Sequence, residues 1–120
     1  MIRLIFVLRR KPSMSRDEFQ KYWHELHGPL VAKHTTTLNI LRYIQNHTLD
    51  DPMNEQMARA RGGMEPPYDG VAELWFDSID DLNKAFSEPR YLELIRPDEL
   101  KFADLGNCVS FVTEEVPICG

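Results

Sequence analysis

The sequence predicts an α+β protein in which four strands form one antiparallel sheet with helices on one face. Three observations lead to this prediction. Strand-like apolar segments and amphipathic segments follow one another in the order β-α-β-β-α-β, the split βαβ arrangement. Serines that can act as helix N-caps precede two of the helical segments. No internal repeat or low-complexity tract divides the 120 residues, so one domain over residues 1–120 is expected.

The first half of the chain begins with an apolar strand and continues into a capped helix. Ser15 is a preferred N-cap residue, and Glu18 three residues later completes a capping box. Gly28 precedes a proline, which disfavours helical dihedrals and is expected to end the helix at about His27. Pro29 suits the first turn of a second, short helix. The expected elements are a strand at Ile2–Leu8, a helix at 15–27, a short helix at 29–34 and a strand at 41–48.

The second half repeats this order after an unusual connecting segment. Residues 49–67 carry three methionines and two adjacent glycines, which suits an adaptable lid or a surface loop without a role. Ser78 is expected to cap a helix, and Pro89 and Pro97 punctuate a further helical stretch. The expected elements are a short helix at 53–61, a strand at 69–77, helices after residue 78 and around residues 89–97, and a strand at 107–116.

Composition and charge exclude several classes of function. The formal net charge is −5, and the one basic cluster, Arg9-Arg10-Lys11, is better explained as a solvated strand end than as a phosphate-binding patch. We therefore expect no nucleic-acid partner. The apolar runs are far shorter than the ~20 residues of a membrane span, and no signal peptide is recognisable. Cys108 and Cys119 are expected to be free thiols in a reducing cytoplasm.

Two of the expected strands carry apolar side chains on both faces. Neither Ile2–Leu8 nor residues 71–76 alternate between apolar and polar residues, although a sheet with one solvated face should alternate. The helices of the same chain can cover only one face, and no segment remains for the other. The sequence therefore predicts a homodimer packed sheet face to sheet face.

Three motifs resemble the EthD family. They are FxxYWHxxHGPLV at residues 19–31, LRYIQNH at 41–47 and ELWF at 73–76. The helix motif that ends in His-Gly-Pro is the most specific, and the resemblance covers most of the chain. The opening residues 1–19 also resemble the muconolactone-type methylisomerases of the same superfamily. Leu74 stands where those enzymes carry an active-site cysteine, which argues against the same lactone chemistry.

This resemblance implies a fold and a kind of ligand, but no single reaction. EthD proteins belong to the dimeric α/β-barrel superfamily, whose subunits have ferredoxin-like folds and pack sheet to sheet. Each subunit would hold a pocket between its sheet and helices for a small hydrophobic ligand, often aromatic, polyketide-like or lactone-like. The superfamily includes decarboxylases, isomerases, cyclases, cofactor-free oxygenases and haem-binding enzymes, so the fold does not settle the chemistry.

His27 is the leading candidate for catalysis. It ends a helix whose apolar stripe includes Phe19, Trp23 and Leu26. At about 100° per residue His27 falls at the border of that stripe, whereas His24 falls nearly opposite. An imidazole at the edge of a pocket can change charge near neutral pH. The alternative is that His27 only caps the helix C-terminus, where the helix dipole favours a cation.

The histidines form no recognisable metal site. His24 and His27 diverge around the helix, and no carboxylate stands at a ligand-like spacing. His34 or His47 could serve as an axial haem ligand, but no feature distinguishes either. We therefore expect no metal and no cofactor.

Tyr43 is the second catalytic candidate. In a strand it shares a face with Gln45 and His47, so its hydroxyl could donate a proton or orient a substrate carbonyl. The alternative is cross-strand packing with the hydroxyl in solvent; the EthD-like pattern favours the pocket. Glu73 could be a buried base or an interface ion-pair partner of Arg42. The residues expected to bind substrate are Trp23, Asn46, His47, Glu73, Trp75, Phe86 and Tyr91, of which Trp75 could instead belong to the core or the dimer interface.

Together these features favour a cofactor-independent enzyme acting on a small hydrophobic substrate. His27 would transfer a proton as base or acid, and Tyr43 would hydrogen-bond a substrate oxygen. The expected reaction is a decarboxylation, isomerisation or cyclisation, of lyase or isomerase type. A small-molecule carrier without turnover fits the pocket equally well, and a cofactor-free or haem-related monooxygenase is a third interpretation. A co-purified ligand recovered unchanged would favour the carrier, and visible absorbance would favour haem.

Overall fold

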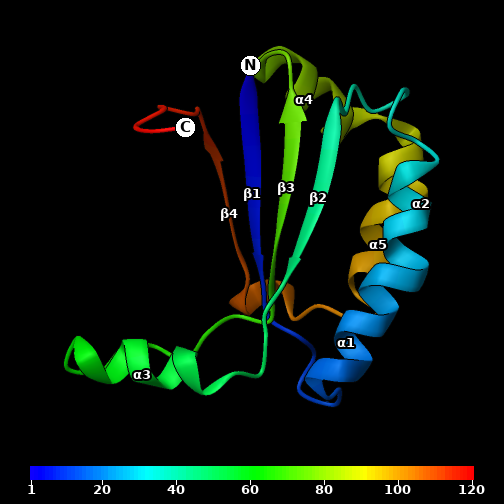
Figure 1. The fold of residues 1–120 in the computed structure, drawn as a ribbon. Coiled ribbons are helices and arrows are strands. Elements are labelled where there is room, and N and C mark those ends of the chain that lie inside the picture. The colour runs from blue at the N-terminus through cyan, green and yellow to red at the C-terminus, as the bar shows by residue number, and fades with distance from the viewer.

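The computed structural model describes all 120 residues and has one four-stranded sheet in the order β2-β3-β1-β4 (Figure 1). β1 (Ile2–Leu8) lies between β3 (Gly70–Phe76) and β4 (Val109–Thr113), and β2 (Arg42–His47) forms the edge beyond β3. All three pairings are antiparallel. This order confirms the predicted ferredoxin-like α+β fold, and the strand bounds agree with the sequence prediction to within a few residues.

The first helical segment is longer than predicted. α1 (Arg16–Tyr22) starts with the expected capping box between Ser15 and Glu18, then continues through the π-helical turn η1 (Trp23–His27) into α2 (Gly28–Ala32). The expectation that the helix ends at about His27 is therefore wrong, because Gly28 keeps helical dihedrals; the predicted short helix is present as α2 but continues the first one. In η1 the Gly28 N–H donates to the Trp23 carbonyl, an i→i+5 bond that widens the turn. The wider turn gives room for the ring of Pro29, which would clash with the preceding turn of a regular α-helix.

A second π-helical turn has the same local pattern. η2 (Tyr91–Ile95) runs into α5 (Arg96–Glu99), and the Arg96 N–H donates to the Tyr91 carbonyl. Proline follows the π turn at the second position in both places, in the segments WHELHGP and YLELIRP. The remaining helices are α3 (Pro52–Ala60), α4 (Ile79–Ser87) and the 3-10 turn η3 (Leu105–Asn107). None of these helices has the length and apolar character that crossing a membrane requires.

The segment that contains α3 stands apart from the rest of the molecule. Figure 1 shows α3 projecting well away from the sheet and from α1, α2 and α5. None of its residues is buried, and Met53 and Met57 are exposed. An N-cap bond from the Met53 N–H to the Asp51 carboxylate begins the helix, as the Asp-Pro signal favours.

The sheet face opposite the helices carries charged as well as apolar side chains. Arg3 and Arg42 are the cross-strand neighbours of Trp75, and their guanidinium carbons lie 5.2 and 4.8 Å from the centroid of its ring. These arginines cover the indole, which is only 8% exposed although no helix packs on it. Glu73 pairs with Arg3 at 3.2 Å rather than with Arg42. Phe111 on β4 is 47% exposed.

Asp69, just before β3, links the end of β1 to the start of α1 through hydrogen bonds. Its buried carboxylate accepts hydrogen bonds from the Arg10 backbone N–H at 2.8 Å and from the Arg16 Nε at 3.0 Å. Burial alone would raise the pKa of Asp69, but the hydrogen bonds from Arg10 and Arg16, together with the Arg10 charge, outweigh it and lower the pKa. The buried charge thus fixes the start of α1 relative to the sheet.

The packing of Trp23 on β3 depends on the missing side chain of Gly70. A Cβ at Gly70 would lie 2.5 and 2.8 Å from two carbons of the Trp23 ring. We expect Gly70→Ala to lower the free energy of unfolding by about 1–3 kcal/mol, because overpacking forces the indole or the strand to move. Urea unfolding would measure this, with Gly106→Ala as the control, since a Cβ there meets nothing within 4 Å. An unchanged midpoint for Gly70→Ala would contradict this packing.

Candidate functional site

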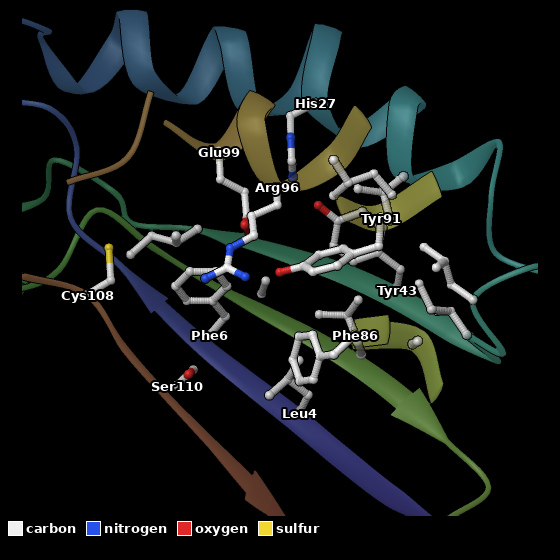
Figure 2. A pocket seen from close by; sticks show the side chains of 18 of the residues that line it. Leu4, Phe6, His27, Tyr43, Phe86, Tyr91, Arg96, Glu99, Cys108 and Ser110 are labelled. Atoms are coloured by element: carbon white, nitrogen blue, oxygen red, sulfur yellow. The ribbon is translucent and has the colours of Figure 1, made fainter. Parts of the chain in front are cut away.

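A cavity of about 450 Å³ lies between the sheet and the helices, within the range of small-molecule sites (Figure 2). Its floor includes Leu4, Leu74 and Tyr43, which are direct neighbours across β1, β3 and β2. Its walls come from η1, α4, η2 and α5, and most of the lining side chains are hydrophobic. The lining side chains with polar, ionisable or nucleophilic groups are those of His27, Tyr43, Tyr91, Arg96, Glu99, Cys108 and Ser110.

This cavity separates two halves of the hydrophobic core. One half is built around Phe19, Trp23 and Phe102, and the other contains Val31, Phe76, Leu82, Ala85 and Ile95. Only Tyr43 and Leu74 pack against both halves. The two halves therefore leave space between them, and Tyr43 stands where they meet.

His27 is held at the cavity by a buried carboxylate. Its Nδ1 lies 2.8 Å from Oδ2 of Asp98, and the Tyr22 hydroxyl donates to Oδ1 of the same carboxylate at 2.6 Å. Burial would raise the pKa of Asp98, but the bonds from Tyr22 and His27 outweigh it and the pKa is lowered. Burial also lowers the pKa of His27, against the attraction of Asp98. An ionised Asp98 can only accept, so Nδ1 carries the proton and neutral His27 presents an unprotonated Nε2.

The π turn explains why this histidine faces inward. A turn that closes by an i→i+5 bond has more residues than an α turn, so each residue rotates by a smaller angle about the helix axis. The residues after Trp23 are therefore turned back toward the cavity. His27 is consequently 5% exposed and lines the cavity, whereas Leu26 is 58% exposed. The expectation that Leu26 belongs to the buried stripe, with His27 at its border, is therefore wrong. His24 is exposed, as expected from its position on the helix.

Glu99 is the most perturbed carboxyl group at the cavity. Figure 2 shows Glu99 and Arg96 pointing from α5 into the cavity. Burial raises the pKa of Glu99 to about 7, although the Arg96 charge and the Tyr91 hydroxyl act in the other direction. Such a carboxyl group can either donate or accept a proton near neutral pH, which is the property of a general acid or base.

Tyr43 reaches the helix layer through Gln45. The Gln45 amide nitrogen donates to the Tyr43 oxygen at 2.8 Å and to the Trp23 carbonyl at 2.9 Å. Because the phenol oxygen accepts this bond, its own hydrogen is available to another acceptor. Burial raises the pKa of Tyr43 and raises that of Tyr91 to about 12, so both phenols keep their protons and act as donors at neutral pH.

The structure brings five of the nine predicted site residues to this cavity. Trp23, Phe86 and Tyr91 line it together with His27 and Tyr43. His47 shares the helix-facing side of the sheet but lies outside the cavity, stacked on Trp23 with ring centroids 4.7 Å apart. The segment 49–67, considered as a lid, contributes no residue to the cavity lining.

Asn46, Glu73 and Trp75 lie on the opposite face of the sheet. On that face the Asn46 amide donates to Glu73 at 3.1 Å, and Trp75 packs beneath Arg3 and Arg42. Strand alternation is the physical reason, because Tyr43 and Asn46 are an odd number of residues apart and must face opposite ways. The structure therefore separates these three residues from His27 and Tyr43.

Sequence reasoning did not select Asp98, Glu99 or Arg96. A signal for them exists in YLELIRP, which repeats the aromatic, Glu-Leu and Pro spacing of WHELHGP and directly precedes Asp98-Glu99. Cys108 is a free thiol that also lines the cavity, and burial raises its pKa. No three His, Cys, Asp or Glu side chains are grouped so that they could hold a metal ion together. Neither His34 nor His47 is among the residues that line the cavity.

Comparison with known proteins agrees with this architecture. The family model of the EthD domain matches residues 11–106. The conidial pigment biosynthesis dehydratase EthD of Metarhizium robertsii is 32% identical over 97 residues, covering 79% of this chain and 68% of that protein. The dehydratase aurZ of Gibberella zeae is 28% identical over 106 residues, covering 87% of this chain and 70% of that protein.

Solved structures share the fold at low sequence identity. An EthD family protein from Bacillus halodurans superposes with a TM-score of 0.68 at 19% identity, over 97% of this chain and 100% of that one. A dimeric protein of unknown function with a ferredoxin-like fold from Bacteroides fragilis gives a TM-score of 0.65 at 9% identity, over 95% of each chain. Together with the residues and the fold, the family match shows that this chain belongs to the EthD domain family.

Proposed function

We propose that this protein is a cofactor-independent dehydratase, a lyase that removes water from a small hydrophobic substrate of polyketide type. The observation that carries the proposal is the pairing, in one apolar cavity, of a neutral His27 with a Glu99 whose pKa is about 7. Dehydration needs one group that takes a proton and another that gives one. The names of the two fungal relatives, both dehydratases, favour this reaction over decarboxylation or isomerisation.

The proposed reaction acts on a β-hydroxy ketone. Nε2 of His27 removes a proton from the carbon beside the carbonyl, while the Tyr43 hydroxyl donates a hydrogen bond to the carbonyl oxygen. The electron pair of the broken C–H bond forms the C=C bond as the C–O bond breaks. Glu99 gives its proton to the departing hydroxyl, which leaves as water. His27 ends with one proton more and Glu99 with one fewer, and exchange with solvent restores both.

A homodimer through the uncovered sheet faces is part of this proposal. On the sheet face that no helix covers, Phe111 is 47% exposed in one chain, and the structural neighbour from Bacteroides fragilis is described as dimeric. Exposed apolar surface of this kind favours association with a complementary surface. Sedimentation in solution is expected to give twice the mass of the 14.0 kDa chain, and a monomer would contradict the interface.

Turnover of a substrate panel tests the proposed reaction. The purified protein, incubated with aromatic β-hydroxy ketones, is expected to yield a product lighter by one water, with the absorbance of a newly conjugated double bond. Heat-denatured protein is the control for spontaneous loss of water. A compound that raises the melting temperature of the protein but is recovered unchanged across the panel would instead indicate a carrier.

A further inference from the structure

We propose that Arg96 binds a negatively charged oxygen of the ligand, so that the cavity selects apolar molecules bearing one carboxylate or enolate. This inference rests on the proposed function, because it describes a substrate class for the same cavity. It adds a charge requirement that dehydration of a β-hydroxy ketone does not itself impose.

The position of Arg96 is set by the second π turn. η2 closes through the Arg96 N–H, and the residue then opens α5 at the cavity wall. Arg96 is an exposed residue, but Figure 2 shows its guanidinium group directed into the cavity near Phe6. The group therefore occupies an open end of the site, with an apolar surface beneath it.

The guanidinium group of Arg96 has no partner within the protein. Arg3, Arg10 and Arg16 each form ion pairs with carboxylates, whereas Arg96 forms none and donates no side-chain hydrogen bond. The positive charge of Arg96 still acts on groups at the cavity, because it lowers the pKa values of Glu99 and Tyr91. A planar fork of donors above an apolar surface matches the two oxygens of a carboxylate or of a 1,3-dicarbonyl enolate.

Anion binding at Arg96 would also support the proposed chemistry. Arg96 lowers the pKa of Glu99, while Asp98, the other charged group acting on it, raises the pKa. A ligand anion paired with Arg96 cancels the first influence and adds a negative charge of its own. Both changes favour the protonated Glu99 that gives its proton to the leaving hydroxyl. The same contact would therefore bind the substrate and keep Glu99 protonated for its role as the acid.

Matched probes of one shape test the charge requirement. We expect 2-naphthoate to bind the wild-type protein about 10- to 100-fold more tightly than methyl 2-naphthoate in calorimetric titrations, the ratio typical of hydrogen bonds to a charged group. The enolate of 2-acetyl-1,3-indandione distinguishes an enolate site from a carboxylate site. Arg96→Gln is expected to remove the preference for the anions, and Arg96→Lys to retain part of it. Arg90→Gln, at an exposed arginine that does not line the cavity, is the matched control.

Equal affinity for the acid and its ester, an anion preference that persists in Arg96→Gln, or no binding of any probe by the folded protein would overturn the assignment. The outcome is separable from that of the proposed function. A preference for the anions that depends on Arg96, in a protein that dehydrates nothing in the substrate panel, would leave the anion site in place and remove the dehydratase.

Discussion

Replacement of Glu99 by glutamine is expected to lower kcat/KM for dehydration by about 10²–10⁴, the usual contribution of a positioned acid. The amide keeps the size and polarity of the side chain but cannot give a proton to the departing hydroxyl. Steady-state kinetics on a substrate found in the panel would measure the loss. Glu93→Gln is the matched control, because Glu93 is an exposed residue of η2 that does not line the cavity. Comparable losses in both variants would contradict a specific role for Glu99.

The dependence of the rate on pH separates this role from a structural one. Glu99 must be protonated to act as an acid, so kcat/KM of the wild-type protein should fall as pH rises through about 7. His27 must be neutral to act as a base, so the rate should also fall at low pH, below the ordinary histidine pKa of 6.5. Glu99→Gln is expected to lose the alkaline fall and keep the acidic one.

Stability provides an internal check that the variant is folded. The pKa of Glu99 is about 7 in the folded protein against an ordinary value of 4.5, so the folded state binds this proton more tightly than the unfolded state. Stability is therefore lost as pH rises from 4.5 to about 7, by about 3 kcal/mol at most. Glu99→Gln removes this loss and should unfold at a higher urea concentration than the wild type at pH 8. An inactive variant that is also less stable at pH 8 would point to misfolding.

Much of the fold is predictable because its signals are local. Ser15 with Glu18 and the Ser78 cap mark helix starts that the structure confirms, and apolar runs mark the strands. The prediction failed at Gly28, where a proline normally ends a helix. There the helix continues past the proline through a π turn. No local rule of capping or propensity predicts whether a helix continues in this way or ends.

Site residues were predictable only where a single helix or strand determines which way the side chain points. His27 and Tyr43 were selected because a helix end and a strand face can be seen in a short window of sequence. Strand alternation alone already separates Asn46 from Tyr43. Glu73 and Trp75 belong to another strand, so placing them on the opposite face also needs the register between β2 and β3. The ionisation of Glu99 could not be foreseen in this way, because its burial comes from packing between segments far apart in the chain.

Replacement of His27 by glutamine is expected to reduce kcat/KM by about 10²–10⁴, because the amide cannot take a proton from carbon. The acidic fall in the pH profile should disappear, while the alkaline fall assigned to Glu99 stays. His24→Gln is the control on the same helix, since His24 is exposed and does not line the cavity. A His27→Gln variant that keeps its acidic fall would assign the base to another group.

The hydrogen bond from His27 to Asp98 predicts which nitrogen acts, and a variant of Asp98 tests that directly. In Asp98→Asn the amide can donate to Nδ1, which would move the imidazole proton to Nε2. The ring would stay in place, but Nε2 could no longer take a proton. A comparable change of tautomer in a serine protease triad lowers the rate by up to about 10⁴. The ¹⁵N shifts of His27 should report the change of tautomer. Tyr22→Phe removes only the other bond to Asp98, at 2.6 Å, and should leave the tautomer and most of the rate intact. If Asp98→Asn loses activity with the tautomer unchanged, then Asp98 acts through packing rather than by positioning the proton of His27.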